Sequence, residues 1–374
     1  MTPRAAYVHV PFCRRRCGYC NFTVVAGRDD LVADYLRAIE LELQLLSAPR
    51  EIDTLFFGGG TPTQLPAEAL ERLCQLTARW LPRAADSEFS VEANPADLDE
   101  ERVGVLRSAG VNRISLGGQS FDDAKLKVLE RDHRRGQLER TLGRCRHAFP
   151  SLALDLIFAA PGESLATWLG DLHAAIAAGV DHVSTYGLTW EKGAAFWGRR
   201  QRGSLTPADE EVERQMYEAA IDTLTAAGFE HYEVSNFARP GHRCRHNEVY
   251  WRGQEYFAVG PGAARYVDGW REINHRSTTT YLNRVLAGQS PVAERERLPP
   301  AEAARERLVF GLRMLEGVER KGFAAATGLE IDALVGDALR GFVAQGLLED
   351  TGDCIRLTRQ GLLVSDALWP AFLG

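Results

Sequence analysis

YVHVPFCRRRCGYCNF, residues 7–22, carries the most informative spacing in this chain of 374 residues. A run of apolar and β-favouring residues leads directly into Cys13, Cys17 and Cys20, which are spaced C-x3-C-x2-C. Three thiolates on one tight loop can bind three irons of a cubane cluster and leave the fourth iron open to another ligand. The stretch therefore predicts a 4Fe–4S cluster directly after a β-strand.

Zinc is the main alternative for these cysteines. Structural zinc usually has four ligands, often from paired C-x2-C knuckles, and no second pair accompanies this loop. His9 could supply a fourth ligand, but its place on an apolar strand favours a ring that points into the protein. The chain has seven cysteines, an odd number, which argues against a disulfide framework. We expect Cys74, Cys145 and Cys354 to be small core residues.

Strands and helices alternate after the cysteine loop. The expected strands are residues 7–10, 52–57, 88–92, 111–116, 152–158 and 182–188. Such alternation predicts parallel strands joined by right-handed crossovers. We therefore expect an α/β fold, a partial (β/α)6 barrel with its chemistry at the carboxyl ends of the strands. An open Rossmann-type sheet is the alternative, but no GxGxxG motif follows the first strand.

The regular alternation of strands and helices ends in the second half of the chain. We expect the barrel to comprise residues 1–235, a connecting region residues 236–298, and a smaller, mostly helical domain residues 299–374. The order of helices and short strands in this last domain resembles a winged helix. A net charge of −7 favours a structural role for it, so we expect no nucleic-acid partner. The sequence lacks a transmembrane run and a secretory signal, which predicts a cytoplasmic protein.

Several motifs together resemble one known family. They are the cysteine loop, FFGGGTPT (56–63), LGGQSF (116–121), DLIFAAPGES (155–164), HYEVSNFA (231–238) and HNEVYW (246–251). The C-x3-C-x2-C loop resembles that of the radical S-adenosylmethionine (SAM) superfamily. The wider set resembles the oxygen-independent coproporphyrinogen III oxidases, and within them most closely the HemW branch of heme chaperones. The resemblance covers nearly the whole chain.

This resemblance implies a set of SAM-binding residues. SAM would chelate the open iron through its amino and carboxylate groups. The implied contacts are Tyr7, Tyr19, Gly59, Gly60, Thr61, Glu92, Gln119, Arg131, Asp155 and Gly187. Their chemistry is suitable, because a carboxylate such as Glu92 can accept from an ammonium or a hydroxyl, and Arg131 can pair with a carboxylate. The alternative is that Glu92 and Arg131 are solvated residues of the barrel rim.

The HNxxYW pattern of residues 246–251 is associated with heme in the HemW branch. Imidazole is a common axial ligand of heme iron, so His246 is the candidate ligand, ahead of Cys244 and His242. Tyr250 and Trp251 could stack on a porphyrin. Alternatively, His246 hydrogen-bonds within the chain and the two aromatic residues pack an interface.

Two features separate the branches of the family. The oxidases carry a further cysteine where this chain has Phe22, and an extension before the loop, whereas Cys13 lies close to the start of the sequence. Both differences favour the HemW branch. The chain also departs from the family at Gly118, at Ala159 and at Ala264, and the last change removes a histidine that could contact a porphyrin.

The expected function is that of a HemW-type chaperone, which binds heme and a SAM-ligated 4Fe–4S cluster. It would receive electrons from a donor and deliver heme to an acceptor protein, either soluble or membrane-associated. No catalytic residue is assigned, and turnover of SAM and the oligomeric state are left open. The alternatives are a coproporphyrinogen III oxidase, a HemN-like radical SAM methyltransferase and, last, a nucleic-acid-binding regulator with a sensory cluster.

Overall fold

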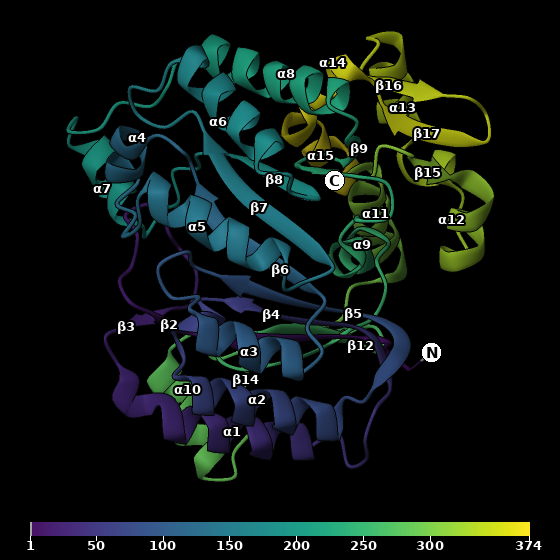
Figure 1. Cartoon of the computed structure of the whole chain (residues 1–374). Coiled ribbons are helices and arrows are strands. Elements are labelled where there is room, and N and C mark those ends of the chain that lie inside the picture. Colours follow the sequence, from purple (N-terminus) through teal and green to yellow (C-terminus); the bar gives the residue numbers. More distant parts are fainter. Residues whose placement is uncertain (1) are drawn as a thin grey trace.

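The computed structural model describes residues 2–374, and a nine-stranded sheet forms its centre. The strand order is β11-β1-β4-β5-β6-β7-β8-β10-β9. The six middle strands are parallel: β1 (Ala5–Val10), β4 (Ile52–Gly59), β5 (Arg83–Ala93), β6 (Arg113–Gln119), β7 (Ser151–Phe158) and β8 (His182–Gly187). The six predicted strands and their parallel arrangement are therefore confirmed, and they curve as a partial barrel (Figure 1).

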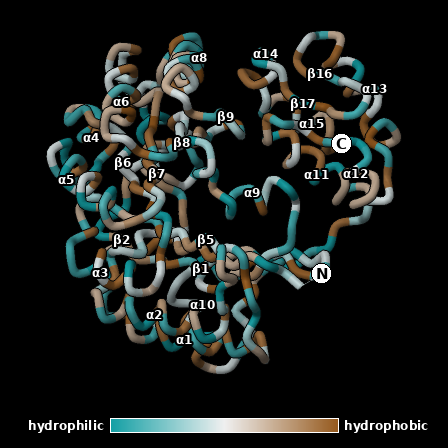
Figure 2. Tube along the Cα trace, turned by 45° about the vertical axis from the view of Figure 1, so that its right-hand side comes forward, coloured by the Kyte–Doolittle hydropathy of each residue, from teal (hydrophilic) through white to brown (hydrophobic). Residues whose placement is uncertain are grey.

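Helices cover the outer face of this sheet. They are α1 (Val32–Gln44), α2 (Ala67–Trp80), α3 (Glu100–Ser108), α4 (Asp123–Val128), α5 (Arg135–Arg146), α6 (Leu165–Ala177) and α8 (Glu210–Ala226). The short helix α7 (Ala195–Gln201) lies instead against the cysteine loop, where the N–H of Phe196 donates to the carbonyl of Gly18 over 2.8 Å. Their apolar positions recur at helical spacing, as in α1, where Tyr35, Ile39 and Leu43 are fully buried. The strands carry most of the apolar stretches, whereas the outer surfaces of the helices are largely hydrophilic (Figure 2).

Aspartate and serine side chains cap the starts of α3, α4, α6 and α8. Asp99 accepts from the backbone N–H of Arg102 at the start of α3, and Ser164 accepts from that of Thr167 at the start of α6. Each cap satisfies a backbone donor that the first turn of a helix leaves without a partner. The boundaries of these crossover helices therefore follow from local sequence.

The connecting region is built onto the edges of the barrel sheet. β11 (Phe257–Val259) is parallel to β1, while β9 (Glu230–Glu233) and β10 (Asn236–Ala238) extend the other edge in antiparallel fashion. A separate sheet contains β12 (Ala264–Val267), β13 (Trp270–Asn274) and β14 (Val292–Glu296), and it is flanked by α10 (Thr278–Leu286). Helix α9 (Arg245–Trp251) lies between the barrel and the C-terminal domain (Figures 1 and 2).

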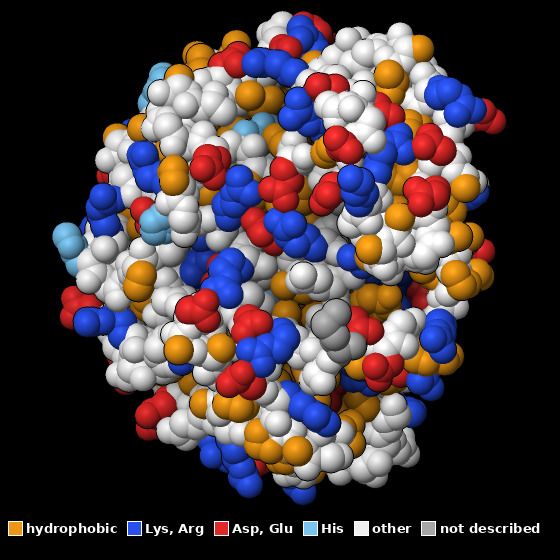
Figure 3. Space-filling model, turned by 90° about the vertical axis from the view of Figure 1, so that its right-hand side faces the viewer, with side chains coloured by type: hydrophobic (Ala, Val, Ile, Leu, Met, Phe, Trp, Pro, Cys, Tyr) orange, Lys and Arg blue, Asp and Glu red, His pale blue; other side chains and the backbone are white. Residues whose placement is uncertain are grey.

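The C-terminal domain has its own apolar core. It consists of α11 (Pro300–Leu312), β15 (Val318–Glu319), α12 (Arg320–Thr327), α13 (Ile331–Ala344), β16 (Leu348–Asp350), β17 (Cys354–Leu357), α14 (Arg359–Leu362) and α15 (Ser365–Leu373). Three helices followed by a small antiparallel sheet match the winged-helix order expected for it. Acidic and basic side chains are interspersed over the face of the molecule that bears this domain (Figure 3).

Short elements complete the described chain. They are β2 (Phe12–Cys13), β3 (Val25–Ala26) and the 3-10 turns η1 (Asp29–Leu31) and η2 (Pro62–Gln64). β2 and β3 pair in parallel and close the cysteine loop at its base. Among residues 2–374, every helix is too short or too polar to cross a membrane.

Candidate functional site

A single large cavity lies at the carboxyl ends of the barrel strands. Its volume is about 1160 Å³. The predicted site residues that line it are Cys13, Cys17, Tyr19, Cys20, Gly59, Gly60, Thr61, Glu92, Gln119, Arg131, Asp155 and Gly187. Tyr7 and His246 are not among its lining residues. Residues from five barrel strands and from the cysteine loop therefore meet around one space, although they are distant in sequence.

The cysteine loop is held at its base by the backbone. The N–H of Val25 donates to the carbonyl of Pro11 over 2.8 Å, and the N–H of Thr61 donates to the carbonyl of Phe12 over 2.7 Å. Within the loop, the N–H of Cys20 donates to the carbonyl of Cys17 over 3.1 Å. Both ends of the loop are thus held in place by hydrogen bonds. Its three free thiols are half-buried and line the cavity.

The three thiols suit a cluster better than a single ion. Among residues 2–374, no three His, Cys, Asp or Glu side chains converge closely enough to hold one metal ion. A cubane does not need such convergence, because each cysteine binds a different iron. His9 is not a free ligand either, since its Nε2 lies 2.7 Å from the carbonyl oxygen of Thr23 and its Nδ1 lies 3.1 Å from the Tyr7 hydroxyl.

His9 acts as a support beneath the cluster loop. Burial lowers its pKa to about 4, so the ring is neutral near pH 7. Gly59 passes directly over the ring with φ of +107°, and a Cβ there would lie 2.3 Å from a ring carbon. Only glycine allows both this backbone conformation and this approach. The glycine run at the end of β4 is therefore required by packing, independently of any ligand.

Glu92 lies deep in the cavity beside that glycine run. Its Oε2 accepts from the N–H of Gly59 over 3.0 Å, and a Cβ on Gly58 would meet the carboxylate at 2.9 Å. Burial, together with the nearby charge of Asp155, raises the pKa of Glu92 to about 7. A bound cation would favour the ionised form, since an opposite charge stabilises a carboxylate. Glu92 is therefore ready to receive an ammonium group or hydroxyls.

Asp155 faces Glu92 from the end of β7. The hydroxyl of Ser115 donates to its carboxylate over 3.2 Å. Burial raises the pKa of Asp155, while hydrogen bonds from Ser184 and Ser115 oppose that shift. Two half-buried carboxylates, on β5 and β7, make this end of the cavity suitable for a ligand that carries positive charge or several hydroxyl groups.

Arg131 connects the cluster loop to the opposite wall. Its Nη1 lies 3.5 Å from the Cys17 sulfur and 3.4 Å from the Tyr19 hydroxyl, while Nη2 donates to the carbonyl of Gly117 over 2.8 Å. Its buried Nε has no hydrogen-bond partner. These contacts contradict the alternative of a solvated rim arginine. A free, buried donor beside the cysteines suits an anionic group such as a carboxylate.

The backbone at the end of β6 is in an unusual conformation. Gln119 has φ of +66°, in the left-handed region that non-glycine residues rarely adopt. Such strain persists only where the surroundings impose it, and it concentrates at ligand sites. Nearby, Gly118 replaces the usual valine of the family, and the side chains of Leu138 and Leu154 fill the space where a Cβ would lie.

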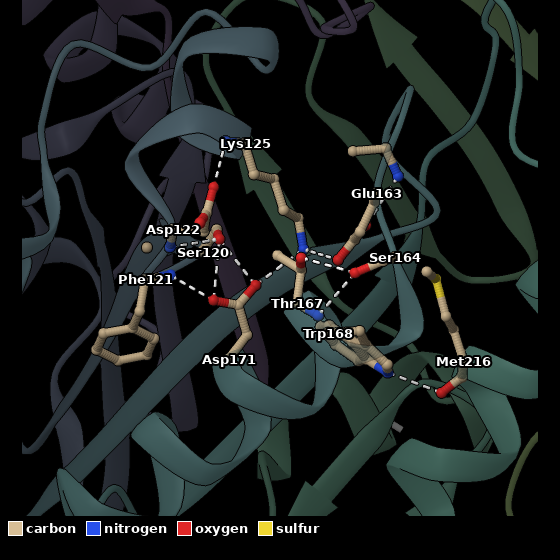
Figure 4. A network of polar contacts seen from close by, with 12 residues as sticks. Ser120, Phe121, Asp122, Lys125, Glu163, Ser164, Thr167, Trp168, Asp171 and Met216 are labelled. Carbon is tan, nitrogen blue, oxygen red and sulfur yellow. Dashed lines mark hydrogen bonds and ion pairs between the residues drawn. The ribbon is translucent and has the colours of Figure 1, made fainter.

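A buried ionic network fixes the two loops behind this wall (Figure 4). Lys125 of α4 binds Glu163, which precedes α6, and it lies 2.9 Å from the carboxylate of Asp171 within α6. Asp171 also accepts from the hydroxyl of Ser120 and from the N–H of Phe121 over 2.6 Å. The side chains of the three charged residues are at most 3% exposed. The network therefore ties the loop that follows Gln119 to the loop that follows β7.

The structure places His246 away from the cavity, inside the amino end of the barrel. Its side chain is buried, its Nδ1 lies 2.8 Å from the Thr54 hydroxyl, and its Nε2 lies 2.8 Å from the Tyr250 hydroxyl. Its ring stacks on Phe56 with centroids 5.2 Å apart, near Tyr7. Both ring nitrogens have protein partners, so this conformation offers no free nitrogen to an iron. The predicted heme ligand is thus not presented to any ligand here.

The rest of the HNxxYW segment also contacts other parts of the chain. Glu88 of β5 accepts from the N–H groups of Arg245 and His246 at the start of α9, and the Cys244 thiol lies 3.7 Å from it. Trp251 packs on the C-terminal domain, where the guanidinium of Arg313 lies 4.5 Å from its ring. In this conformation Tyr250 contacts His246 and Trp251 packs on the C-terminal domain, as the interface alternative describes.

Some cavity residues were not predicted from the sequence. The cysteine loop contributes three exposed arginines, Arg14, Arg15 and Arg16, and the C-terminal domain contributes residues 362–367. Phe22 is 68% exposed and Tyr186 43% exposed, and both line the cavity. The arginine triplet was visible in the sequence, but the approach of residues 362–367 to the cluster loop depends on tertiary structure.

Comparisons with known proteins agree on one family. Residues 7–175 match the radical SAM superfamily and residues 298–364 match the HemN C-terminal domain. A heme chaperone HemW of Bacillus subtilis is 35% identical over 99% of both chains. That of Escherichia coli is 34% identical over 100% of this chain and 99% of its own.

A solved structure supports the fold. Coproporphyrinogen III oxidase (HemN) from Escherichia coli, described as a radical SAM enzyme, superposes with a TM-score of 0.87 at 22% identity. The match covers 99% of this chain and 90% of that one. At this level of identity the likeness establishes a common architecture, including the helical C-terminal domain, and does not establish a common reaction.

Proposed function

The chain belongs to the HemW family of radical SAM proteins, and from this premise we propose that it is a heme chaperone that passes heme to an acceptor protein. Family membership implies a 4Fe–4S cluster and SAM in the same chain. The observation that carries the proposal is the composition of the cavity: an inner end with three cysteines and buried charges, and an outer end with exposed apolar side chains.

The inner end would hold the cluster and SAM. Cys13, Cys17 and Cys20 are the proposed iron ligands. Glu92 would accept from the SAM ammonium or hydroxyl groups, and Arg131 would pair with its carboxylate through the free Nε donor. When bound, the cluster would supply an electron at this end of the cavity. The residues around it would hold and orient SAM, and they need not themselves transfer a proton.

Heme would lie in the outer end of the cavity. Pockets for one small molecule usually measure about 300–1,000 Å³, and this cavity of about 1160 Å³ has room for a second ligand beside SAM. Phe22, Tyr186 and Val364 are three of the six large apolar side chains most exposed in the described chain, and all three line this cavity. Such a patch commonly marks a binding site.

Charged groups near this patch would complement the propionates of heme. Arg14 and Arg276 line the same cavity, and guanidinium groups pair well with carboxylates. Axial ligation by His246 remains a second hypothesis, because the HNxxYW pattern is characteristic of the family. It would require the ring to release Thr54 or Tyr250, and hence a movement of α9.

A coproporphyrinogen III oxidase and a HemN-like methyltransferase are the two alternative functions. Phe22 in place of the cysteine that the oxidases carry argues against the first. The second would need a site for another SAM, which the outer end of the cavity could provide. Methylated products would favour it.

Heme titration of two double variants tests the proposed site. Tyr186→Ser with Val364→Ser should weaken heme binding about 100-fold, since each lost apolar contact contributes about 1.5 kcal/mol and 1.4 kcal/mol corresponds to a factor of ten. The matched control, Leu45→Ser with Val343→Ser, changes exposed apolar residues outside the cavity and should bind as the wild type does. The readout is the absorbance of bound heme.

His246→Ala separates the two heme hypotheses. Because His246 is buried and hydrogen-bonded at both nitrogens, its replacement should lower thermal stability but leave the spectrum of bound heme unchanged. If a folded His246→Ala protein loses heme while the Tyr186/Val364 variant retains it, the outer-cavity site is wrong and the motif provides the ligand.

A further inference from the structure

We propose that Thr61 is a positioning residue for the cluster: its hydroxyl donates to the Cys13 sulfur, which fixes this ligand and makes the cluster easier to reduce. Thr61 directly follows the glycine run at the end of β4, and it lines the cavity together with Cys13. The proposal rests on the proposed cluster. It gives the Thr61 side chain a role at the cluster, whereas the family resemblance implies for this residue only a contact with SAM.

The backbone brings Thr61 to the start of the cysteine loop. The N–H of Gly60 donates to the carbonyl of Val10 over 2.8 Å, and the next N–H, that of Thr61, donates to the carbonyl of Phe12 over 2.7 Å. A Cβ on Gly60 would lie 2.7 Å from the carbonyl oxygen of Phe12, so glycine at this position permits the close approach of the two segments. Two successive backbone hydrogen bonds therefore hold Thr61 beside Cys13, although 48 positions separate these two residues in the sequence.

The side chains of these two residues are in contact. The Oγ1 atom of Thr61 lies 3.6 Å from the Cys13 sulfur. While Cys13 is a thiol, either atom can be the donor. A cysteine that binds a metal has lost its proton, so its sulfur can only accept. When Cys13 binds iron, the Thr61 hydroxyl is therefore the donor, and the distance suits an O–H···S hydrogen bond.

A hydrogen bond to a cluster sulfur favours the reduced state of the cluster. Reduction adds one electron, and a donor near a sulfur stabilises the added negative charge, so the reduction potential depends on such hydrogen bonds. Thr61 and Cys13 are both half-buried, and a hydrogen bond is electrostatically stronger there than in water. No bond forms or breaks when the electron is added, and the hydroxyl proton stays on Thr61. The expected effect of the hydroxyl is therefore a higher reduction potential.

A second donor lies near another ligand, but it is less suitable for a test. The Nη1 atom of Arg131 lies 3.5 Å from the Cys17 sulfur. Replacing Arg131 would also remove its contacts with the Tyr19 hydroxyl and the carbonyl of Gly117, which belong to the opposite wall of the cavity. Replacing Thr61 with valine removes one hydroxyl and keeps the β-branched shape of the side chain. The Thr61 variant therefore separates the hydrogen bond from the packing around it.

The test is the reduction potential of the reconstituted protein without SAM, titrated anaerobically with dithionite and followed by the EPR signal of the reduced cluster. In Thr61→Val the equilibrium constant for one-electron reduction should fall about tenfold, which corresponds to a potential about 59 mV lower. Thr61→Ser retains the hydroxyl and should stay within about twofold of the wild type. Resonance Raman spectra report on the hydrogen bond itself, because its loss strengthens the iron–sulfur bond. The Fe–S(Cys) bands should therefore shift to higher frequency in Thr61→Val and not in Thr61→Ser.

Thr63→Val is the matched control. Thr63 lies in the adjoining turn η2, and its hydroxyl accepts from the N–H of Asn94 over 3.4 Å instead of contacting a cysteine. The same substitution is thus made in the same segment without the contact to sulfur. Thr63→Val should keep the reduction potential, with an equilibrium constant within about twofold of that of the wild type.

The outcomes separate this proposal from the proposed function. A wild-type protein that takes up no iron would contradict the cluster itself, and with it the proposed function. With the cluster present, an unchanged potential in Thr61→Val overturns the role of the hydroxyl, and so does an equal fall in Thr63→Val or in Thr61→Ser. If Thr61→Val does not fold, Thr61→Ala, which also lacks the hydroxyl, takes its place with the same expected fall, and an unchanged potential there overturns the proposal equally.

Discussion

Replacing Cys13, Cys17 or Cys20 with serine is expected to abolish cluster binding. With three protein ligands, the loss of one leaves two thiolates, so the iron content after anaerobic reconstitution should fall from about four per chain to near zero. We expect the same effect from each of the three replacements, because all three cysteines lie half-buried on one loop that lines one cavity. Iron and sulfide analysis, together with the charge-transfer absorbance, measures the effect.

The chain provides its own control for this experiment. Cys354 is half-buried on β17 in the C-terminal domain, with its sulfur 3.3 Å from the carbonyl oxygen of Glu316, and it does not line the cavity. Cys354→Ser should keep the full iron content. If two of the three loop variants retained a complete cluster, the ligand assignment would be wrong, and the remaining cysteines would have to be examined.

Lys125→Met is expected to cost about 3–5 kcal/mol of stability, because it leaves two carboxylates buried without their cation. Glu163 and Asp171 both depend on Lys125, whose side chain is only 3% exposed (Figure 4). Its ammonium also lies 5.1 Å from the centre of the Trp168 ring. Unfolding in urea, followed by tryptophan fluorescence, should show the loss as a lower midpoint with an unchanged slope.

A matched exposed pair shows whether burial is the cause. The side chains of Arg340 and Asp337 are 68% and 100% exposed. Arg340→Met should therefore change stability by less than about 1 kcal/mol. If Lys125→Met lowered the stability by less than about 1 kcal/mol as well, the conclusion that the buried network stabilises the two loops would be wrong. A triple variant that also neutralises Glu163→Gln and Asp171→Asn should recover part of the loss.

Much of the barrel could be predicted from the sequence. Each of the six parallel strands is a short apolar run between helical stretches, and the residues at their carboxyl ends carry the polar groups of the cavity. β11 was not predicted, because its three residues lie in a glycine-rich segment and are defined by pairing with β1. Strands this short have little local signal.

The role of His246 shows where sequence patterns reach their limit. The pattern identified a histidine near two aromatic residues. Such a histidine can be a heme ligand, or it can be a buried residue that hydrogen-bonds within the chain. Thr54, which lies 192 residues away, and Tyr250 decide between these in the structure, since they occupy both ring nitrogens. Lys125 is similar, because a single lysine on a short helix gives no indication that its two carboxylate partners lie in the next crossover.

The most direct test of the account is the fate of coproporphyrinogen III with the reconstituted protein, SAM and reductant, measured beside heme binding in the same preparation. The account predicts about one heme per chain and no protoporphyrinogen, because the loop has Phe22 where the oxidases have cysteine. Formation of protoporphyrinogen without retention of heme would contradict the chaperone function and identify the outer cavity as an oxidase substrate site.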